Sequence, residues 1–252
     1  KQPYLPLLPE TLQIPFNDFE ALEQIDRDTA AVLVEPIQAE GGVILPRPGY
    51  LEALRQRCNE TGSLLIFDEV QTGIGRTGQW FACQHWQVVP DLIVMAKALG
   101  GGMPLGCFTG SPELMQQLSS GTPLSHLTTF GGHPVSCAAG LGALEAIEEE
   151  NLLERARLLG ERIMQTLDRW KADFPYLRDV RGKGLLIGLE MDTARRARHV
   201  IRRSAAHGLI VGDCLHAPTV VKLSPPLTLS DDEVETGLQK LRAALQDSQV
   251  AE

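Results

Sequence analysis

The stretch Ser63-Leu-Leu-Ile-Phe-Asp68 is a short, continuous apolar run that ends in an acid. Two similar runs lie on either side of it in the sequence, Ala30-Ala-Val-Leu-Val-Glu35 and Asp91-Leu-Ile-Val-Met-Ala-Lys97. Apolar runs without polar alternation, separated by about thirty residues of helical or irregular chain, are typical of parallel strands covered on both faces. The first part of the chain is therefore predicted to be an α/β unit built on a mostly parallel sheet.

The remaining elements are predicted from hydrophobic spacing. Helical spacing covers residues 16–25, 48–61, 134–149, 151–171, 194–207 and 230–246, and further strand-like runs cover 105–109, 185–191, 208–212 and 219–223. Ser230 followed by Glu233 matches the capping box of a helix start. The order and spacing of the predicted helices and strands change near residue 150. The net charge changes there as well, from −11 over residues 1–150 to +2 over residues 151–252. We expect a larger domain over 1–150 and a small α+β domain over 151–252.

Composition excludes several classes of function. The net charge of −9 argues against nucleic acid or an anionic membrane as a partner, and no apolar run approaches the roughly 20 residues needed to span a bilayer. The basic stretch from Arg195 to Arg203 is interpreted as the solvated face of a helix. Five scattered cysteines and six histidines show no ligand spacing, so no metal site is expected. Unpatterned cysteines fit a reducing compartment, and we expect a cytoplasmic protein.

A charged residue follows each of the first three predicted strands: Glu35, Asp68 and Lys97. Ligands of open parallel sheets bind in the crevice beyond the carboxyl ends of the strands. We therefore expect two carboxylates and a lysine to face one crevice, although a single charged residue after a strand is usually only a loop residue that meets water.

Lys97 precedes a glycine-rich turn, Gly100-Gly-Gly102. Glycines let backbone approach a ligand closely, but no P-loop or well-placed dinucleotide fingerprint accompanies them, so a nucleotide-binding turn stays a weaker alternative. A lysine near a bound cofactor can act as a Schiff-base amine, and an aspartate facing it suits the protonated nitrogen of a pyridinium ring.

Four segments carry a resemblance to a known family. They are Glu35-Pro-Ile-Gln-Ala-Glu-Gly-Gly42, Phe67-Asp-Glu-Val-Gln-Thr-Gly-Ile-Gly-Arg-Thr-Gly78, Ala96-Lys-Ala-Leu-Gly-Gly-Gly102 and Thr128-Thr-Phe-Gly-Gly-His-Pro134. In this order and spacing they resemble the signature segments of class III pyridoxal-phosphate (PLP) aminotransferases of the ornithine and acetylornithine type. The resemblance runs from about residue 12 to residue 246. It implies fold type I, with residues 1–150 as the C-terminal part of the large cofactor-binding domain.

The resemblance implies a role for five residues at the cofactor. Lys97 would form a Schiff base with PLP and then move the proton between the substrate and the cofactor. Asp68 would pair with the pyridine nitrogen, Val70 would pack on the ring face, and Gln71 would hydrogen-bond the phenolic oxygen. Thr129 would reach the cofactor phosphate of a neighbouring subunit, which implies a homodimer. Val70 as a plain core residue is an alternative that the sequence leaves open, as is Glu35 as a buried structural acid.

The resemblance also implies a substrate site with Glu40 and Lys222. Glu40 corresponds to the glutamate that gates the substrate carboxylate. Lys222 stands where the ornithine and acetylornithine enzymes usually carry arginine, and it offers a point charge in place of a bidentate fork. The expected substrates are a primary amine donor and an oxo acid such as 2-oxoglutarate, and the lysine makes a diamine or an ω-amino acid a more plausible donor.

The family's first half is absent from this sequence. The turn that cradles the cofactor phosphate and the aromatic that stacks on the ring should lie upstream of Lys1, so we expect the 252-residue chain alone to bind PLP poorly. Aminomutases usually lack glutamine at the position of Gln71, and the related decarboxylases lack a glutamate that matches Glu40. Aminotransferase chemistry is therefore favoured over these two, and over a non-catalytic protein, because Lys97 and Asp68 are both present.

Overall fold

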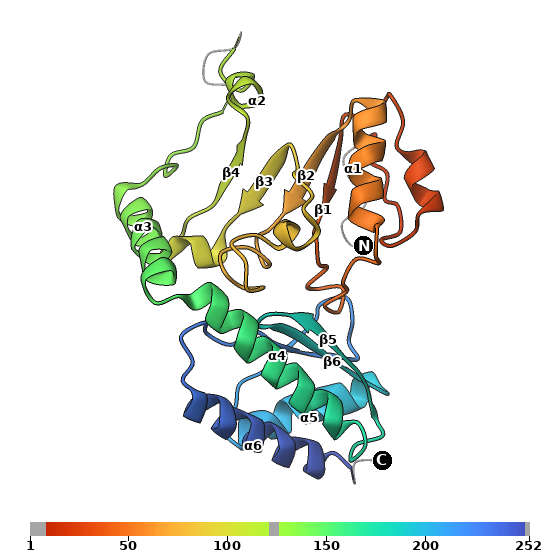
Figure 1. Ribbon diagram of the computed structural model, residues 1–252, viewed down its shortest axis with the longest axis vertical. Helices are drawn as coiled ribbons and strands as arrows, with labels where there is room; N and C mark the ends of the chain where they lie inside the picture. Colours follow the sequence, from red (N-terminus) through yellow and green to blue (C-terminus); the bar gives the residue numbers. More distant parts are fainter. Residues whose placement is uncertain (1–8, 121–125, 250–252) are drawn as a thin grey trace.

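The computed structural model describes residues 9–120 and 126–249. Figure 1 shows two sheets, one in the upper part of the molecule and one in the lower part, with the long helix α4 leading from the first part into the second. Helices α1 and α3 lie on either side of the upper sheet, whereas α4, α5 and α6 gather around the lower one (Figure 1). The proposed domain boundary at residue 150 falls between α3 (Pro134–Glu149) and α4 (Leu152–Trp170).

The upper sheet has the strand order β1-β2-β3-β4. The strands β1 (Ala31–Val34), β2 (Leu64–Asp68) and β3 (Leu92–Met95) are parallel, which confirms the prediction from the apolar runs. The fourth strand, β4 (Cys107–Gly110), is antiparallel to β3. A parallel return needs a crossover of a dozen or more residues, and the connection through η4 (Lys97–Gly100) is shorter than that.

Helix α1 (Tyr50–Thr61) covers one face of this sheet. It buries Tyr50, Leu51, Leu54 and Cys58, which belong to one apolar cluster with Leu65 and Phe67 of β2. Gly62 ends the helix in the left-handed conformation that glycine adopts most readily. Two short 3-10 helices, η2 (Glu20–Gln24) and η3 (Ala82–Trp86), complete the layer, so the longer helix predicted over residues 16–25 is reduced to one turn.

The lower sheet is antiparallel, in the order β5-β6-β8-β7. Its strands are β5 (Leu177–Lys183), β6 (Leu186–Met191), β7 (Gly212–Asp213) and β8 (Val220–Leu223), and its other helices are α5 (Ala194–Ala206) and α6 (Asp231–Asp247). The main core of this part lies between one face of the sheet and α4, α5 and α6, and it includes Leu167, Leu189 and Val221. The predicted capping box of Ser230 and Glu233 is confirmed at the start of α6.

One predicted strand is largely absent, and two elements of the structure were not predicted. The strand expected over 208–212 is irregular except at Gly212, where the short strand β7 begins. Strand β5 was not predicted, because its polar residues resemble a loop, and it lies at the edge of the sheet where polar side chains meet water. The short helix α2 (Pro112–Gln116) was also missed, although Ser111 caps it through its hydroxyl.

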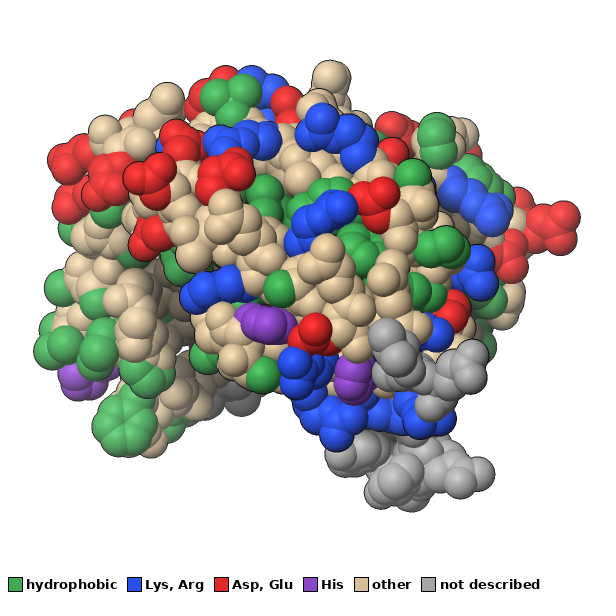
Figure 2. Space-filling model, turned by 90° about the horizontal axis from the view of Figure 1, so that it is seen from below, with side chains coloured by type: hydrophobic (Ala, Val, Ile, Leu, Met, Phe, Trp, Pro, Cys, Tyr) green, Lys and Arg blue, Asp and Glu red, His purple; other side chains and the backbone are tan. Residues whose placement is uncertain are grey.

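The surface of the lower part carries both signs of charge. Figure 2 views the molecule from this end and shows acidic and basic side chains interspersed over much of it, with one cluster of basic side chains near the lower edge. Arg196 and Arg203 of α5 pair with Asp192 and Asp247. The basic stretch is therefore the exposed side of a helix whose apolar face, with Val200 buried, packs on the core. Among the described residues no helix is long and apolar enough to cross a bilayer.

A third apolar cluster joins the two parts. It contains Ile37, Ala39 and Val43 from the loop after β1, together with Leu186 and Val220 from the lower sheet. All five are almost completely buried. The loop after β1 is therefore packed against the second sheet, and this seam is where the carboxyl ends of the parallel strands meet the small domain.

Candidate active site

Three predicted residues stand at the carboxyl ends of the parallel strands. Asp68 is the last residue of β2, Glu35 directly follows β1, and Lys97 lies two residues beyond β3. Burial raises the pKa of Glu35; the neighbouring charges of Asp68 and Glu40 raise it further, whereas the amide of Ala39 and the charge of Lys97 lower it. Asp68, Glu40 and Lys97 therefore all lie within electrostatic range of Glu35.

Lys97 has an unusual backbone conformation for a non-glycine residue. Its φ angle is 50°, in the left-handed region, which is uncommon outside glycine and is found most often at functional sites. The side chain is exposed, and within residues 9–120 and 126–249 no hydrogen bond or ion pair engages its amine. The turn that follows β3 thus presents a free amine beyond the carboxyl end of that strand.

Gly101, in the turn after Lys97, and Gly140 of α3 let η4 and α3 pack closely together. A Cβ atom on Gly101 would lie 2.5 Å from the carbonyl oxygen of Ala139 in α3, and one on Gly140 would lie 2.8 Å from the carbonyl oxygen of Leu99. Both distances are far below any real contact, so these glycines let η4 and α3 touch through their backbones. This packing explains Gly101 of the turn without a bound nucleotide, whereas Gly102, with a φ angle of +94°, has no atom near the place of a Cβ.

The turn after β2 carries the next predicted residues. Asp68 accepts a hydrogen bond at Oδ1 from the amide of Val70, at 2.9 Å, which orients the carboxylate at the strand end. Val70 is half-buried, and Gln71 donates from Nε2 to Oε1 of Glu40 over 3.0 Å. Residues 68–71 therefore join the end of β2 to the loop that follows β1.

Glu69 was not singled out from the sequence, yet it anchors this turn. Its side chain is 1% exposed and accepts hydrogen bonds from the amides of Ala82 (2.9 Å) and Cys83 (2.8 Å) and from the hydroxyl of Thr72. Burial raises the pKa of Glu69, and these hydrogen bonds oppose the rise. The only signal in the sequence was an acid placed directly after Asp68, which local pattern alone cannot distinguish from a loop residue.

Glu40 and Lys222 form an ion pair across the seam. The Lys222 ammonium donates to Oε1 of Glu40, and the amide of Leu215 donates to Oε2 over 2.9 Å. Burial alone would raise the pKa of Glu40, but the hydrogen bonds from Lys222, Leu215 and Gln71 outweigh it and lower the pKa to about 2. The two residues expected at the substrate site are therefore brought together, and both carboxylate oxygens already have partners.

Thr129 lies apart from the other predicted residues. It is exposed in the segment that leads into α3, beside Phe130, which is 78% exposed. No hydrogen bond joins Thr129 to another residue of the candidate site within the described parts of the chain. Its predicted contact with a neighbouring subunit stays a prediction.

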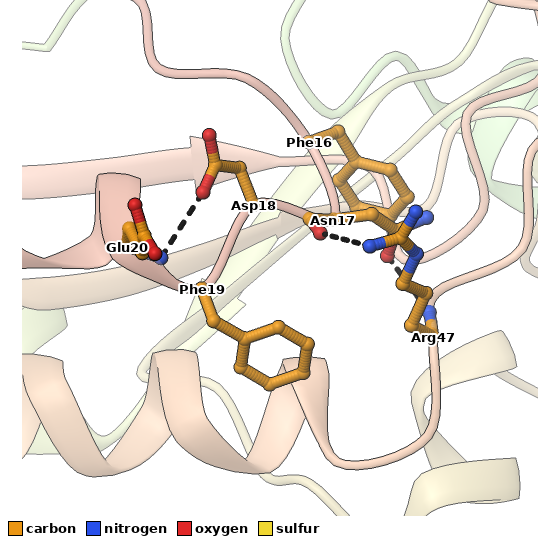
Figure 3. A pocket seen from close by; sticks show the side chains of 6 residues that line it. All are labelled: Phe16, Asn17, Asp18, Phe19, Glu20 and Arg47. Carbon is orange, nitrogen blue, oxygen red and sulfur yellow. Dashed lines mark hydrogen bonds between the residues drawn. The ribbon is translucent and has the colours of Figure 1, made fainter.

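A separate hollow lies at the other side of the upper part (Figure 3). Its lining consists of Phe16, Asn17, Asp18, Phe19, Glu20 and Arg47. Arg47 lies against the backbone of Asn17, and Asp18 accepts a hydrogen bond from the amide of Glu20 (Figure 3). These polar groups form hydrogen bonds with one another, within residues 17–20 and between Asn17 and Arg47. The hollow contains none of the predicted site residues.

Comparison with known proteins agrees with this geometry. The family model "Aminotransferase class-III" matches residues 3–245. The chain belongs to the class III aminotransferase family. The ornithine aminotransferase from Toxoplasma gondii, whose crystal structure has partial occupancy of PLP at its active site, is 33% identical with a TM-score of 0.91 over 98% of this chain and 58% of its own.

Two other aminotransferases are similarly close. The acetylornithine aminotransferase from Elizabethkingia anophelis is 33% identical, with a TM-score of 0.85 over 94% of this chain and 60% of its own. The ornithine δ-aminotransferase from Plasmodium falciparum is 32% identical, with a TM-score of 0.89 over 97% of this chain and 63% of its own. The class III chain therefore spans about three-fifths of the length of these relatives.

Proposed function

We propose that the protein is a PLP-dependent aminotransferase that moves nitrogen from a primary amine donor to an oxo acid such as 2-oxoglutarate. The observation that carries the proposal is the placement of Glu35, Asp68 and Lys97 at or just beyond the carboxyl ends of neighbouring parallel strands, where Asp68, Lys97 and Glu40 all act electrostatically on Glu35. Membership of the class III family supports the same chemistry.

The donor set fits PLP. The aldehyde of PLP requires a free amine, which Lys97 has. Its pyridine nitrogen requires an acid, and its phenolic oxygen requires a hydrogen-bond donor; Asp68 and the amide of Gln71 are such groups. Lys97 would hold the cofactor through its amine and, once released, move the proton at the Cα atom of the donor. Asp68 would keep the pyridine nitrogen protonated, Gln71 would donate to the phenolic oxygen, and Val70 would pack on the ring. The bound cofactor supplies the electron sink.

Glu40 and Lys222 would determine which donor is accepted. Lys222 is 11% exposed, and its ammonium already contacts a carboxylate. An arginine in this place could hold both Glu40 and a substrate carboxylate with its five donors, whereas a lysine has three donors on a single atom. We propose a diamine or an ω-amino acid as the donor, because neither has a carboxylate on the carbon that bears the reacting amine, and so neither requires an α-carboxylate clasp at residue 222.

We also propose a homodimer located in the cytoplasm. Phe130, four residues before α3, and Val135 and Leu141 within α3 expose apolar side chains, and Thr129 directly precedes Phe130. An apolar patch of this kind suits a subunit interface, in which Thr129 would reach the neighbouring cofactor phosphate. All five cysteines are free thiols, which suits a reducing compartment.

A donor panel tests the proposed function. Full-length protein would be incubated with PLP, 2-oxoglutarate and one of ornithine, acetylornithine, putrescine or 4-aminobutyrate, and glutamate would be measured. We expect glutamate with putrescine or 4-aminobutyrate, and we expect Lys222→Arg to shift the preference toward donors with an α-carboxylate. If none of the four donors yields glutamate above a control without PLP, the proposed reaction is wrong.

A further inference from the structure

Arg76 joins the turn after β2 to the lower sheet. Its Nη1 atom donates to the carbonyl oxygens of Leu185, at 3.3 Å, and of Pro225. In return, the amide of Leu185 donates to the carbonyl oxygen of Arg76 over 3.0 Å. Arg76 therefore belongs to the same turn as Asp68 and Gln71, but its contacts are with the small domain.

Glycines allow the two parts to come this close. A Cβ atom on Gly184, whose φ angle is +54°, would lie 2.4 Å from the carbonyl carbon of Thr77. One on Gly160 would lie 2.0 Å from the carbonyl oxygen of Gly184. The backbone of residue 77 therefore packs directly on the β5–β6 turn, and this turn packs directly on the backbone of α4. A contact built this way has little room to slide.

Arg76 has no carboxylate to balance its charge. Burial lowers the pKa of its guanidinium, and none of the ion pairs among the described residues includes it. A desolvated cation that faces only carbonyl oxygens is expensive to keep. Its counterpart Arg181, which reaches from β5 to the carbonyl oxygen of Gly42 at 2.7 Å, is paired with Glu190 and Asp179. The free energy spent on burying the Arg76 guanidinium indicates that this residue serves to position the segments that it contacts.

The carbonyl of Pro225 lies in the irregular segment 224–229, which links β8 to α6. Leu227 of this segment packs on the cluster formed by Ile74 and Leu99 in the larger part. At its other end, Arg155 of α4 donates from Nε to the carbonyl oxygen of Leu229 over 2.8 Å. Two arginines thus hold the two ends of one segment, but only Arg76 comes from the larger part.

We propose that Arg76 is a positioning residue for the amine donor. By holding Leu185 and Pro225, it fixes β8, and with it Lys222, at the distance from Glu40 that the donor site requires. This inference rests on the proposed function and adds to it. It gives Arg76, which is not among the proposed cofactor contacts, the role of keeping Glu40 and Lys222 at a fixed distance from each other.

Arg76→Lys and Arg155→Lys form the matched test. Each variant keeps the positive charge and loses the planar fork. Steady-state kinetics of the PLP-loaded protein with its best donor would be compared with hydrogen exchange of β8 and of the Leu185 amide in the protein without PLP. Thermal unfolding of both variants shows how far each substitution affects overall stability.

We expect Arg76→Lys to raise the KM for the donor about tenfold or more with kcat changed less than about twofold, the pattern of lost uniform binding. Exchange at Leu185 and over residues 220–223 should become faster. Arg155→Lys should lower stability to a similar degree while leaving the KM and these amides unchanged. Equal effects of the two variants, or no effect of Arg76→Lys, would overturn the proposal. If no donor is turned over, the proposed function fails, and the exchange comparison alone decides the role of Arg76.

Discussion

Replacing Glu40 by glutamine tests the ion pair that closes the seam. The pKa of Glu40 is lowered from 4.5 to about 2, so its contribution to stability is complete above pH 4.5 and is lost as the pH falls toward 2. A pKa shift of this size corresponds to about 3 kcal/mol in the free energy of unfolding if the solvent does not screen the charge. The carboxylate is 23% exposed and partly screened by water, so we expect about 1–2 kcal/mol.

The measurement is urea unfolding of wild type and Glu40→Gln at pH 7 and at several values down to pH 2. The other carboxylates titrate in both proteins, so the difference in the free energy of unfolding isolates Glu40. We expect wild type to be more stable at pH 7 and this advantage to shrink by about 1–2 kcal/mol between pH 4.5 and pH 2. A Lys222→Met background should reduce the pH dependence of the difference, because the lysine contributes to the lowered pKa of Glu40 together with the amide of Leu215 and the side chain of Gln71. A difference that stays constant with pH would refute the assignment of the ion pair.

Three further predictions concern stability and reactivity. Gly184→Ala should destabilise the protein by more than about 3 kcal/mol in urea unfolding, because its Cβ would overlap the backbone of Thr77 at 2.4 Å; a loss below about 1 kcal/mol would contradict the close packing. Ser230→Ala should lower stability by about 1 kcal/mol through loss of the cap on α6, and an unchanged unfolding midpoint would show the cap to be dispensable. An alkylating reagent at neutral pH should modify the exposed Cys107 before Cys83, whose pKa burial raises to about 12; mass spectrometry showing the reverse order would contradict the burial of Cys83.

The sequence predicted the sheet best where burial alone determines the pattern. Strands β1, β2 and β3 are continuous apolar runs and are parallel as predicted, but the expected cover on both faces does not hold for β1, where Leu33 is 66% exposed. The polar edge strand β5 escaped prediction because nothing distinguishes it locally from a loop. Its place is determined by β6, with which it forms a long antiparallel ladder.

The candidate site was predicted where chemistry requires a specific residue type. The family resemblance placed Glu40 and Lys222 at one substrate site, and the two residues form an ion pair. The anchoring contacts of Glu69 and the contacts of Arg76 were not predicted, since most of their partners are backbone groups of other elements. Hydrogen bonds to distant backbone leave no mark on local composition. The roles of Val70 and Thr129 stay predictions.

The central claim is that the amine of Lys97 holds the cofactor opposite Asp68. Full-length wild type and Lys97→Ala would each be loaded with PLP and passed through a desalting column, and the visible absorbance and the turnover of the best donor would then be recorded. We predict a stoichiometric, protein-bound cofactor band and turnover for wild type and neither for Lys97→Ala. An alanine variant that keeps both would contradict the account.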